Sequence, residues 1–304
     1  MTIGGSGDGR PTKNQRRDAV RKKATQLRVE QKKKDLRNRV FVRGGIAVAS
    51  VAILAMIALV LVNSIRPAGP GPANMASDGV LIAEGMTAVK TSPLQPDSKP
   101  IPSKPDATGT VADIRIYADY LCPFCGQFEK ANSDQIVTWV KSGAATVEIH
   151  PVSILTHKSS GTQYSLRAAN AAACVANYAP DDFYAFNAVL FAEQPKEGTA
   201  GLDDEAIKAL VKKAGVKAAV SQISTCIDDT TYKSWVVAST DRAVSGPLPN
   251  TGIDAITGTP TVLVNGKQYV GALDDPKEFA AFVLQSAGET YATSTQTPEP
   301  APAG

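Results

Sequence analysis

The sequence predicts an α/β domain that carries an inserted helical subdomain and is preceded by a single transmembrane helix. Residues 111–117 are rich in β-branched and apolar side chains, and a helical pattern follows them directly, as in an α/β unit. Residues 160–246 have helical patterns throughout, and two short apolar runs around Asn265-Gly266 indicate a closing hairpin. A chain of 304 residues with 43% hydrophobic residues can build a substantial core. One α/β domain accommodates these elements better than two.

Charge is distributed unevenly along the chain. Residues 1–43 contain 14 Lys and Arg against 4 Asp and Glu, whereas the rest of the chain contains 18 against 25. A basic run of this kind can bind the phosphates of nucleic acids, but here it lies directly before an uncharged apolar run at 44–62. Basic residues beside a membrane helix keep their side in the cytoplasm. We therefore expect a basic cytoplasmic segment at 1–43 that can touch anionic lipid headgroups, and no nucleic-acid partner.

The apolar run at 44–62 has the length of a membrane span. As a helix it would extend about 28 Å, close to the thickness of the bilayer hydrocarbon. A cleaved signal peptide is the alternative, but the polar lead and the apolar run are both too long for one. No cysteine lies near the end of the run, which excludes a lipid-modified N-terminus. The sequence predicts a transmembrane helix at 44–65 in a single-pass membrane protein, with its N-terminus in the cytoplasm and the following domain outside.

Residues 66–77 are rich in Pro and Gly and are predicted to be a linker between the membrane and the domain. The domain is expected at 78–288, with a first strand at 79–83. Residues 92–109 contain five prolines and are predicted to be a long exposed loop. The domain could therefore begin near residue 78 or near Val111, and the sequence leaves both starts open.

Two cysteines separated by two residues, in Cys122-Pro123-Phe124-Cys125, stand where the predicted strand passes to the helix. The N-terminus of a helix has unpaired N–H groups and a partial positive charge, so a sulfur there ionises more readily. Pro123 fits the first turn, where its missing N–H has no cost. We expect Cys122 to be exposed and to attack, and Cys125 to lie one turn further in and to resolve.

A metal site is the competing interpretation of the cysteine pair. Structural zinc needs four ligands, usually a second closely spaced Cys or His pair. The remaining Cys and His residues of the chain are Cys174, Cys226, His150 and His157, and they do not form such a pair. The sequence therefore predicts a redox pair without a metal or cofactor.

The other elements follow in chain order. The helix that begins at the cysteines is expected to end near Ser142, and alternation at 145–152 predicts the next strand. His150 lies at the end of that strand, where a structural role is a simpler interpretation than a catalytic one. After the hairpin, a final helix is predicted at 275–287. Residues 289–304 lack a hydrophobic face and are predicted to be a disordered tail.

Pro260 opens the first apolar run of the hairpin, in Thr259-Pro260-Thr261, a place where proline and a cis peptide bond are both tolerated. Together with the upstream cysteine pair, this arrangement resembles the thioredoxin fold. The helical insert makes the resemblance closer to the DsbA-like thiol–disulfide oxidoreductases, and in particular to the membrane-anchored, extracytoplasmic proteins of actinobacteria. The resemblance covers about residues 78–288.

The resemblance implies a set of roles and partners. Thr259 and Pro260 would bind the backbone of a substrate beside the redox pair. The substrates would be reduced or unfolded exported proteins, and a membrane oxidase would restore the disulfide.

The residues bear on the direction of electron flow in two ways. A low thiolate pKa stabilises the reduced pair and makes it a strong oxidant. Phe124 stands where DsbA proteins most often have histidine, and Ile116 stands where many relatives place an acid; Asp119 could instead cap the helix. We expect a dithiol oxidase. A disulfide reductase or isomerase of the same fold remains an alternative, as does a membrane-tethered binding or chaperone module with a structural disulfide.

Cys174 and Cys226 lie on different predicted helices of the insert. In an oxidising compartment, and with Cys122 and Cys125 paired by proximity, they are left to pair with each other. Such a bridge would stabilise the fold by roughly 4 kcal/mol in the chain-entropy treatment. Two buried free thiols are the alternative.

Overall fold

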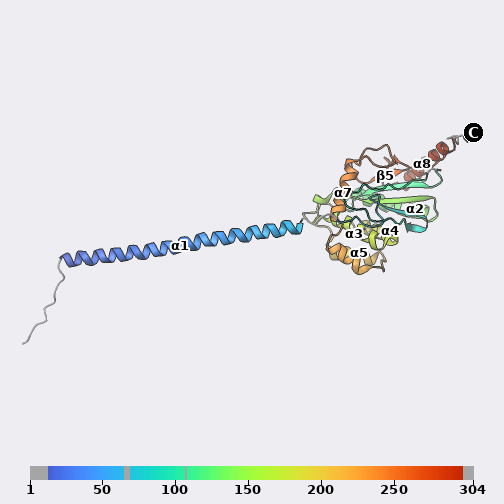
Figure 1. Cartoon of the computed structure of the whole chain (residues 1–304). Helices are drawn as coiled ribbons and strands as arrows, with labels where there is room; N and C mark the ends of the chain where they lie inside the picture. Colours follow the sequence, from blue (N-terminus) through green and yellow to red (C-terminus); the bar gives the residue numbers. More distant parts are fainter. Residues whose placement is uncertain (1–12, 65–68, 107, 297–304) are drawn as a thin grey trace, which may run out of the picture. The chain divides into compact units, whose positions relative to one another are not determined.

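The computed structural model describes residues 13–64, 69–106 and 108–296. The chain divides into two compact units, Met1–Pro67 and Ala68–Gly304 (Figure 1). In the first unit, helix α1 (Lys13–Ser64) runs without a break from the basic segment through the apolar run. No helix among the described residues combines the length and hydropathy needed to cross a membrane, so the transmembrane helix predicted at 44–65 has no support from the structure. Residues 1–12 of the basic segment and 65–68 lie outside the described residues.

The second unit is built on one mixed six-stranded sheet with the order β2-β1-β4-β3-β5-β6. Its strands are β1 (Val80–Ala83), β2 (Thr87–Ala88), β3 (Ala112–Ala118), β4 (Ala145–Pro151), β5 (Thr261–Val264) and β6 (Lys267–Gln268). β3 pairs parallel to β4 and antiparallel to β5, and every residue of β3 is buried. The strand is buried although it contains two charged residues, because Arg115 pairs with Asp113 and with Glu148 of β4.

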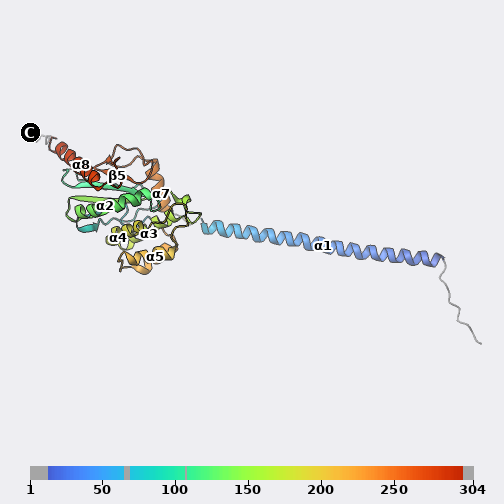
Figure 2. The same ribbon diagram turned by 180° about the vertical axis from the view of Figure 1, so that it is seen from behind.

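Helices cover both faces of the sheet. The α-helices of this unit are α2 (Pro123–Lys141), α3 (Tyr164–Tyr178), α4 (Phe183–Ala192), α5 (Asp204–Lys213), α6 (Val220–Asp228), α7 (Lys233–Ser245) and α8 (Pro276–Gln296). Short 3-10 helices lie at Glu84–Met86, Thr156–Lys158 and Pro180–Asp182. The insert helices α3, α4 and α5 gather below the strands in the view of Figure 1, and Figure 2 shows the same grouping from behind.

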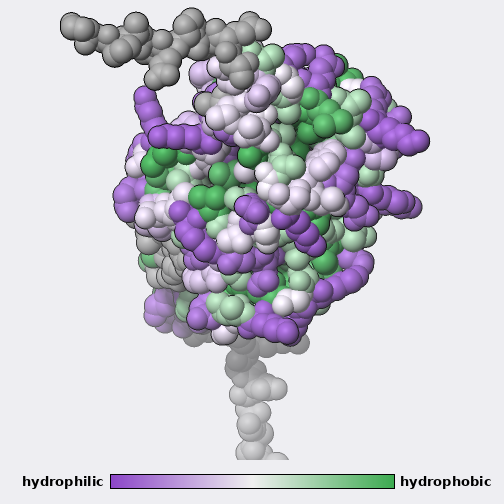
Figure 3. Space-filling view, turned by 90° about the vertical axis from the view of Figure 1, so that its right-hand side faces the viewer, coloured by the Kyte–Doolittle hydropathy of each residue, from purple (hydrophilic) through white to green (hydrophobic). Residues whose placement is uncertain are grey.

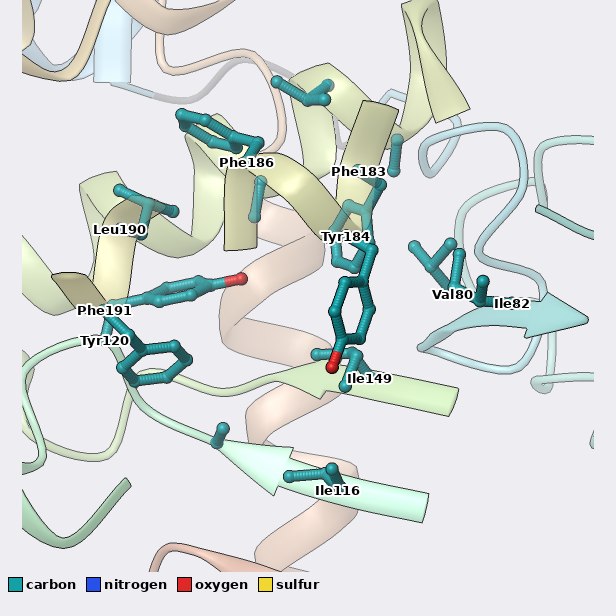
Figure 4. Close-up of a cluster of buried hydrophobic side chains, with 14 of the residues drawn as sticks. Val80, Ile82, Ile116, Tyr120, Ile149, Phe183, Tyr184, Phe186, Leu190 and Phe191 are labelled. Carbon is teal, nitrogen blue, oxygen red and sulfur yellow. The ribbon is translucent and has the colours of Figure 1, made fainter. Parts of the chain in front are cut away.

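The main core lies between the sheet and helices α2, α3, α4 and α8. Phe128 of α2 and Phe279 of α8 meet edge to face with ring centroids 5.1 Å apart. Figure 4 shows the part of this core where aromatic side chains of α4 approach Ile116 of β3 and Ile149 of β4. A smaller cluster on the opposite face contains Tyr117, and α7 contributes to it. On the face shown in Figure 3, hydrophobic residues are interspersed with hydrophilic ones.

The predicted linker at 66–77 is wrong from Gly71 onward. Met75 is buried in the main core, and the side chain of Asn74 donates to the carbonyl of Ala176 in α3. The backbone of Gly71 also donates to the carbonyl of Leu94. These long-range contacts hold a segment whose Pro and Gly content is typical of a tether. They also place the start of the domain well before Val111.

The predicted disordered tail is wrong for residues 289–296, because α8 continues to Gln296. The side chain of Asn265, in the turn between β5 and β6, donates to the carbonyl of Ser286 and to the hydroxyl of Thr290. The hydroxyl of Ser294 donates to the carbonyl of Thr108. These contacts hold the last turns of the helix against the domain although they lack an apolar face. Residues 297–304 lie outside the described residues.

Candidate active site

Cys122 is the N-cap residue of α2, and Pro123 occupies the first turn. β3 ends at Ala118, so only three residues separate the strand from Cys122. The carbonyl of Cys122 accepts hydrogen bonds from the backbone N–H of Cys125 at 3.1 Å and of Gly126 at 3.2 Å. The sulfur of Cys122 therefore lies at the N-terminus of a 19-residue helix, where a negative charge is stabilised.

The segment Thr259-Pro260 lies against Cys122, with a cis peptide bond between the two residues. In its protonated form, the Sγ atom of Cys122 donates to the carbonyl of Thr259 at 3.1 Å. This contact follows from the register of the sheet, because Tyr117 of β3 pairs with Thr261 of β5. Residues that follow β3 and residues that precede β5 consequently meet at one edge. The structure thus brings Cys122, Cys125, Thr259 and Pro260 together.

The two thiols are electrostatically unequal. The pKa of Cys122 is lowered to about 6, mainly by a hydrogen bond from Cys125, and further by Thr259 and the backbone N–H groups of Cys125 and Phe124. The pKa of Cys125 is raised well above its ordinary value, first by burial and then by its contact with Cys122. At neutral pH, Cys122 is mostly a thiolate and Cys125 is a protonated donor. Such a pair has one nucleophile and one resolving thiol.

The expected exposure of Cys122 is wrong. Its exposed fraction is 5% and that of Cys125 is 2%, because Thr259 and the first turn of α2 cover both sulfurs. The exposed group at this place is Phe124, with an exposed fraction of 60%. Both residues between the two cysteines, Pro123 and Phe124, are therefore exposed while the sulfurs are covered.

Asp119 does not cap α2. It is fully buried, and its carboxylate accepts hydrogen bonds from the backbone N–H of Leu121 and Leu155 and from the hydroxyl of Ser165. Burial raises the pKa of Asp119, against the opposing effect of these hydrogen bonds. The carboxylate ties the segment before Cys122 to the chain that follows β4 and to α3.

A buried acid that the sequence interpretation missed lies on α2. Glu129 follows Cys125 by four residues, so the two share a face of the helix. Burial raises the pKa of Glu129 to about 7. Its carboxylate accepts from the side-chain amide of Asn187 at 3.2 Å, and Asn187 accepts from the hydroxyl of Tyr120 at 3.0 Å. In the sequence, Gly126 follows Cys125 and Lys130 follows Glu129, and neither neighbour indicates that Glu129 is buried.

His150 packs against neighbouring side chains of the sheet and lies away from the cysteine pair. Its ring stacks on Tyr117 with centroids 4.4 Å apart, and its Nε2 atom lies 3.3 Å from Glu148. It lines a cavity of about 450 Å³ that contains neither Cys122 nor Cys125. Among the described residues, no cluster of three or more His, Cys, Asp or Glu side chains could hold a metal ion.

The other two cysteines form a disulfide, Cys174–Cys226, which joins α3 to α6. Its Cα atoms are 5.9 Å apart, an ordinary distance for a bridge. Both residues are buried in the insert, whereas Cys122 and Cys125 are free thiols. The pairing expected from elimination is the one present in the structure.

Comparison with known proteins agrees with this geometry. The family model described as thioredoxin matches residues 104–284, which is more than half of the chain. The chain belongs to the thioredoxin family. No curated protein matches it.

Among solved structures, DsbA from Mycobacterium tuberculosis in its reduced form is 27% identical to the chain, with a TM-score of 0.50, and the alignment covers 71% of this chain and 99% of that protein. The oxidised form gives 28% identity, the same TM-score and the same coverage. BdbD from Bacillus subtilis has the same fold at 20% identity and a TM-score of 0.50, over 73% of this chain and 100% of that protein. By family, fold and site, this thioredoxin-family chain is a thiol–disulfide oxidoreductase of the DsbA type.

Proposed function

We propose that this chain is an extracytoplasmic dithiol oxidase that introduces disulfides into exported proteins through Cys122 and Cys125. The observation that carries the proposal is the difference between the two thiols. A nucleophile with a pKa of about 6 stabilises the reduced state as a thiolate, and this drives electrons from the substrate onto the enzyme.

The chemistry is two successive thiol–disulfide exchanges. A substrate thiolate attacks the Sγ atom of Cys122 in the oxidised pair, which forms a mixed disulfide and releases Cys125 as a thiolate that takes up a proton. A second substrate thiolate attacks the substrate sulfur of the mixed disulfide and releases Cys122 as a thiolate. The substrate loses two electrons and the enzyme becomes the dithiol. A membrane oxidase that accepts these two electrons would restore the disulfide by the same type of exchange.

Thr259 and Pro260 are proposed to bind the substrate backbone. The carbonyl of Thr259 is within hydrogen-bond distance of Cys122 Sγ, and both residues are partly exposed. A polypeptide joined to Cys122 must therefore pass beside them. Reduced or unfolded exported proteins fit this site, because recognition through backbone contacts does not demand a particular side chain.

The location is proposed from the sequence and from the second disulfide. The transmembrane helix expected at 44–65 would anchor the chain, with 1–43 in the cytoplasm and the domain outside. The Cys174–Cys226 bridge supports an oxidising compartment. Protease added to intact spheroplasts should digest the domain and spare the basic segment; complete protection of the domain would contradict this topology.

A reductase or isomerase is the second candidate, and Glu129 is the observation that favours it. Reduction of a substrate requires Cys125 to lose its proton, and a buried carboxylate with a pKa near 7 on the same helix face could accept one. The third interpretation, a binding module with a structural disulfide, fits poorly with two free thiols of such different pKa.

One experiment separates these functions. The oxidised full-length chain is mixed with a reduced, unfolded protein, and its reduction potential is measured in glutathione buffers. An oxidase should transfer its disulfide to the substrate and have a potential more oxidising than glutathione. A potential more reducing than glutathione would favour the reductase, and a pair that exchanges with neither partner would leave the binding module.

A further inference from the structure

One face of α4 and the residues after it hold the segment that leads into the cysteine pair. Asn187, Phe191 and Gln194 are spaced four and three residues apart, so they project from the same side. Asn187 accepts a hydrogen bond from the hydroxyl of Tyr120, and the ring centroids of Phe191 and Tyr120 are 5.0 Å apart. Figure 4 shows the side chains of Phe191 and Tyr120 next to each other. The helical insert therefore contacts the redox turn, which we define as residues 120–125.

Of these three residues, Gln194 contacts the backbone of Cys122 itself. It follows the C-cap residue of α4, and its Nε2 atom donates to the carbonyl of Cys122 at 2.9 Å and to the carbonyl of Tyr120 at 3.1 Å. A side-chain amide has two N–H donors on one nitrogen, so a single Gln can bind both carbonyls. An ionised Glu side chain has the same length but no N–H donor, and an Asn side chain is one methylene shorter. Neither matches Gln194 in both length and donors.

The carbonyl of Cys122 is a sensitive place for such a contact. It also accepts the first backbone hydrogen bonds of α2, from Cys125 and Gly126. Its direction fixes the peptide plane after Cys122, and with it the position of the Cys122 sulfur relative to the N–H groups of Phe124 and Cys125. Those N–H groups are among the donors that stabilise the thiolate.

Gly126 provides the space that this contact needs. A Cβ atom at Gly126 would come within contact distance of Gln194 Oε1 and would push the amide away. Gly126 lies inside α2, where glycine is less favourable than alanine. The helix therefore has a poor helix-forming residue at the one position that faces the amide of Gln194.

We propose that Gln194 is a positioning residue for the redox chemistry: it links the helical insert to the redox turn and, through the carbonyl of Cys122, holds the Cys122 sulfur over the N-terminus of α2. The inference rests on the proposed role of Cys122 as the nucleophile. Gln194 touches neither sulfur, so its effect reaches the reaction through the backbone of Cys122.

The test uses the reduced full-length chain and two variants. Gln194→Met keeps the length of the side chain and removes both donors, and Gly126→Ala displaces the amide while it improves the helix. Both should raise the pKa of Cys122 by about one unit, because a displaced sulfur would lose one of its hydrogen bonds from the N–H groups of Phe124 and Cys125, and a hydrogen bond to a charged group has that order of effect. The pKa is followed by the ultraviolet absorbance of the thiolate in a Cys125→Ala background and in the intact pair. Both variants should also make the pair less oxidising in glutathione buffers.

The controls separate positioning from stability. Gln127 lies on the exposed side of α2, and Gln127→Glu should leave the pKa and the potential unchanged, whereas Gln194→Glu should raise the pKa. Gly126→Ala should not lower the melting temperature, so a raised pKa there cannot result from a weakened fold. In a double variant, Gly126→Ala should add little to the effect of Gln194→Met, because the amide that it displaces is already absent.

The inference is overturned if Gln194→Met and Gly126→Ala both keep the wild-type pKa of Cys122. If Gln194→Met does not fold, Gly126→Ala decides alone by the same criterion. The pKa is measured without substrate, so this failure is distinct from a failure of the proposed oxidase activity, which would appear as a wild-type chain that transfers no disulfide.

Discussion

The lowered pKa of Cys122 predicts that the reduced protein gains stability as the pH rises. The folded value is about 6 against an ordinary value of 9.0. Because the folded pKa is the lower one, the stabilisation is fully present above the unfolded value and is lost as the pH falls through the folded value. From these two values the thiolate contributes about 1.4 kcal/mol at pH 7, and almost nothing below about pH 5.

The measurement compares urea unfolding of the reduced wild type with that of reduced Cys122→Ser, at about pH 5, 6 and 7. The difference in the free energy of unfolding between the two should grow by about 1.4 kcal/mol across this range. The oxidised wild type is the matched control, because its Cys122 has no proton to lose. A difference that is the same at every pH would refute the assignment of Cys122 as the low-pKa thiol.

Three further predictions follow from the described contacts. Cys125→Ser should accumulate mixed disulfides with reduced substrates on non-reducing gels, whereas Cys122→Ser should trap none, because the raised pKa of Cys125 keeps the remaining thiol protonated; trapping through Cys125 would reverse the two roles. Replacing both Cys174 and Cys226 by Ala should lower the free energy of unfolding by about 2–4 kcal/mol and leave disulfide transfer largely intact. A folded double variant that transfers no disulfide would show that this bridge shuttles electrons. Phe279→Ala should lower the free energy of unfolding by about 3–5 kcal/mol in denaturant, because the ring is fully buried against three other aromatic rings. A loss below about 1 kcal/mol, as for a surface substitution, would contradict that packing.

Much of the fold could be predicted because its signals are local. The strand at 111–117 and the helix after it are visible in the alternation and spacing of a few neighbouring residues. Asn265-Gly266 identifies the turn between β5 and β6, where both residues have positive φ. The thiol chemistry could be predicted for the same reason, since the position of Cys122 at a helix start is a property of ten consecutive residues.

The errors and omissions have one physical cause, which is contact between distant segments. Met75 is in the core because α3 and the sheet cover it, and no pattern within 66–77 indicates that. The hydrogen bonds of Gln194 to the redox turn span more than 70 residues of sequence. Glu129 is a charged residue type that is usually exposed, but here it is buried where α4 packs against α2. Gln194 and Glu129 acquire their roles only when the insert packs against α2 and the redox turn.

The place of β5 in the sheet sets the order in which the site can assemble. The contact of Cys122 with Thr259 joins residues that are 137 positions apart, and β5 must pair with β3 before the two can meet. During synthesis, the two cysteines leave the ribosome long before the segment that covers them. Until then the edge of β3 that pairs with β5 is unpaired and Cys122 lacks its contact with Thr259, whereas Cys174 and Cys226 have already been synthesised. Correct pairing of the four sulfurs therefore depends on how the chain is handled between the emergence of Cys122 and that of Pro260.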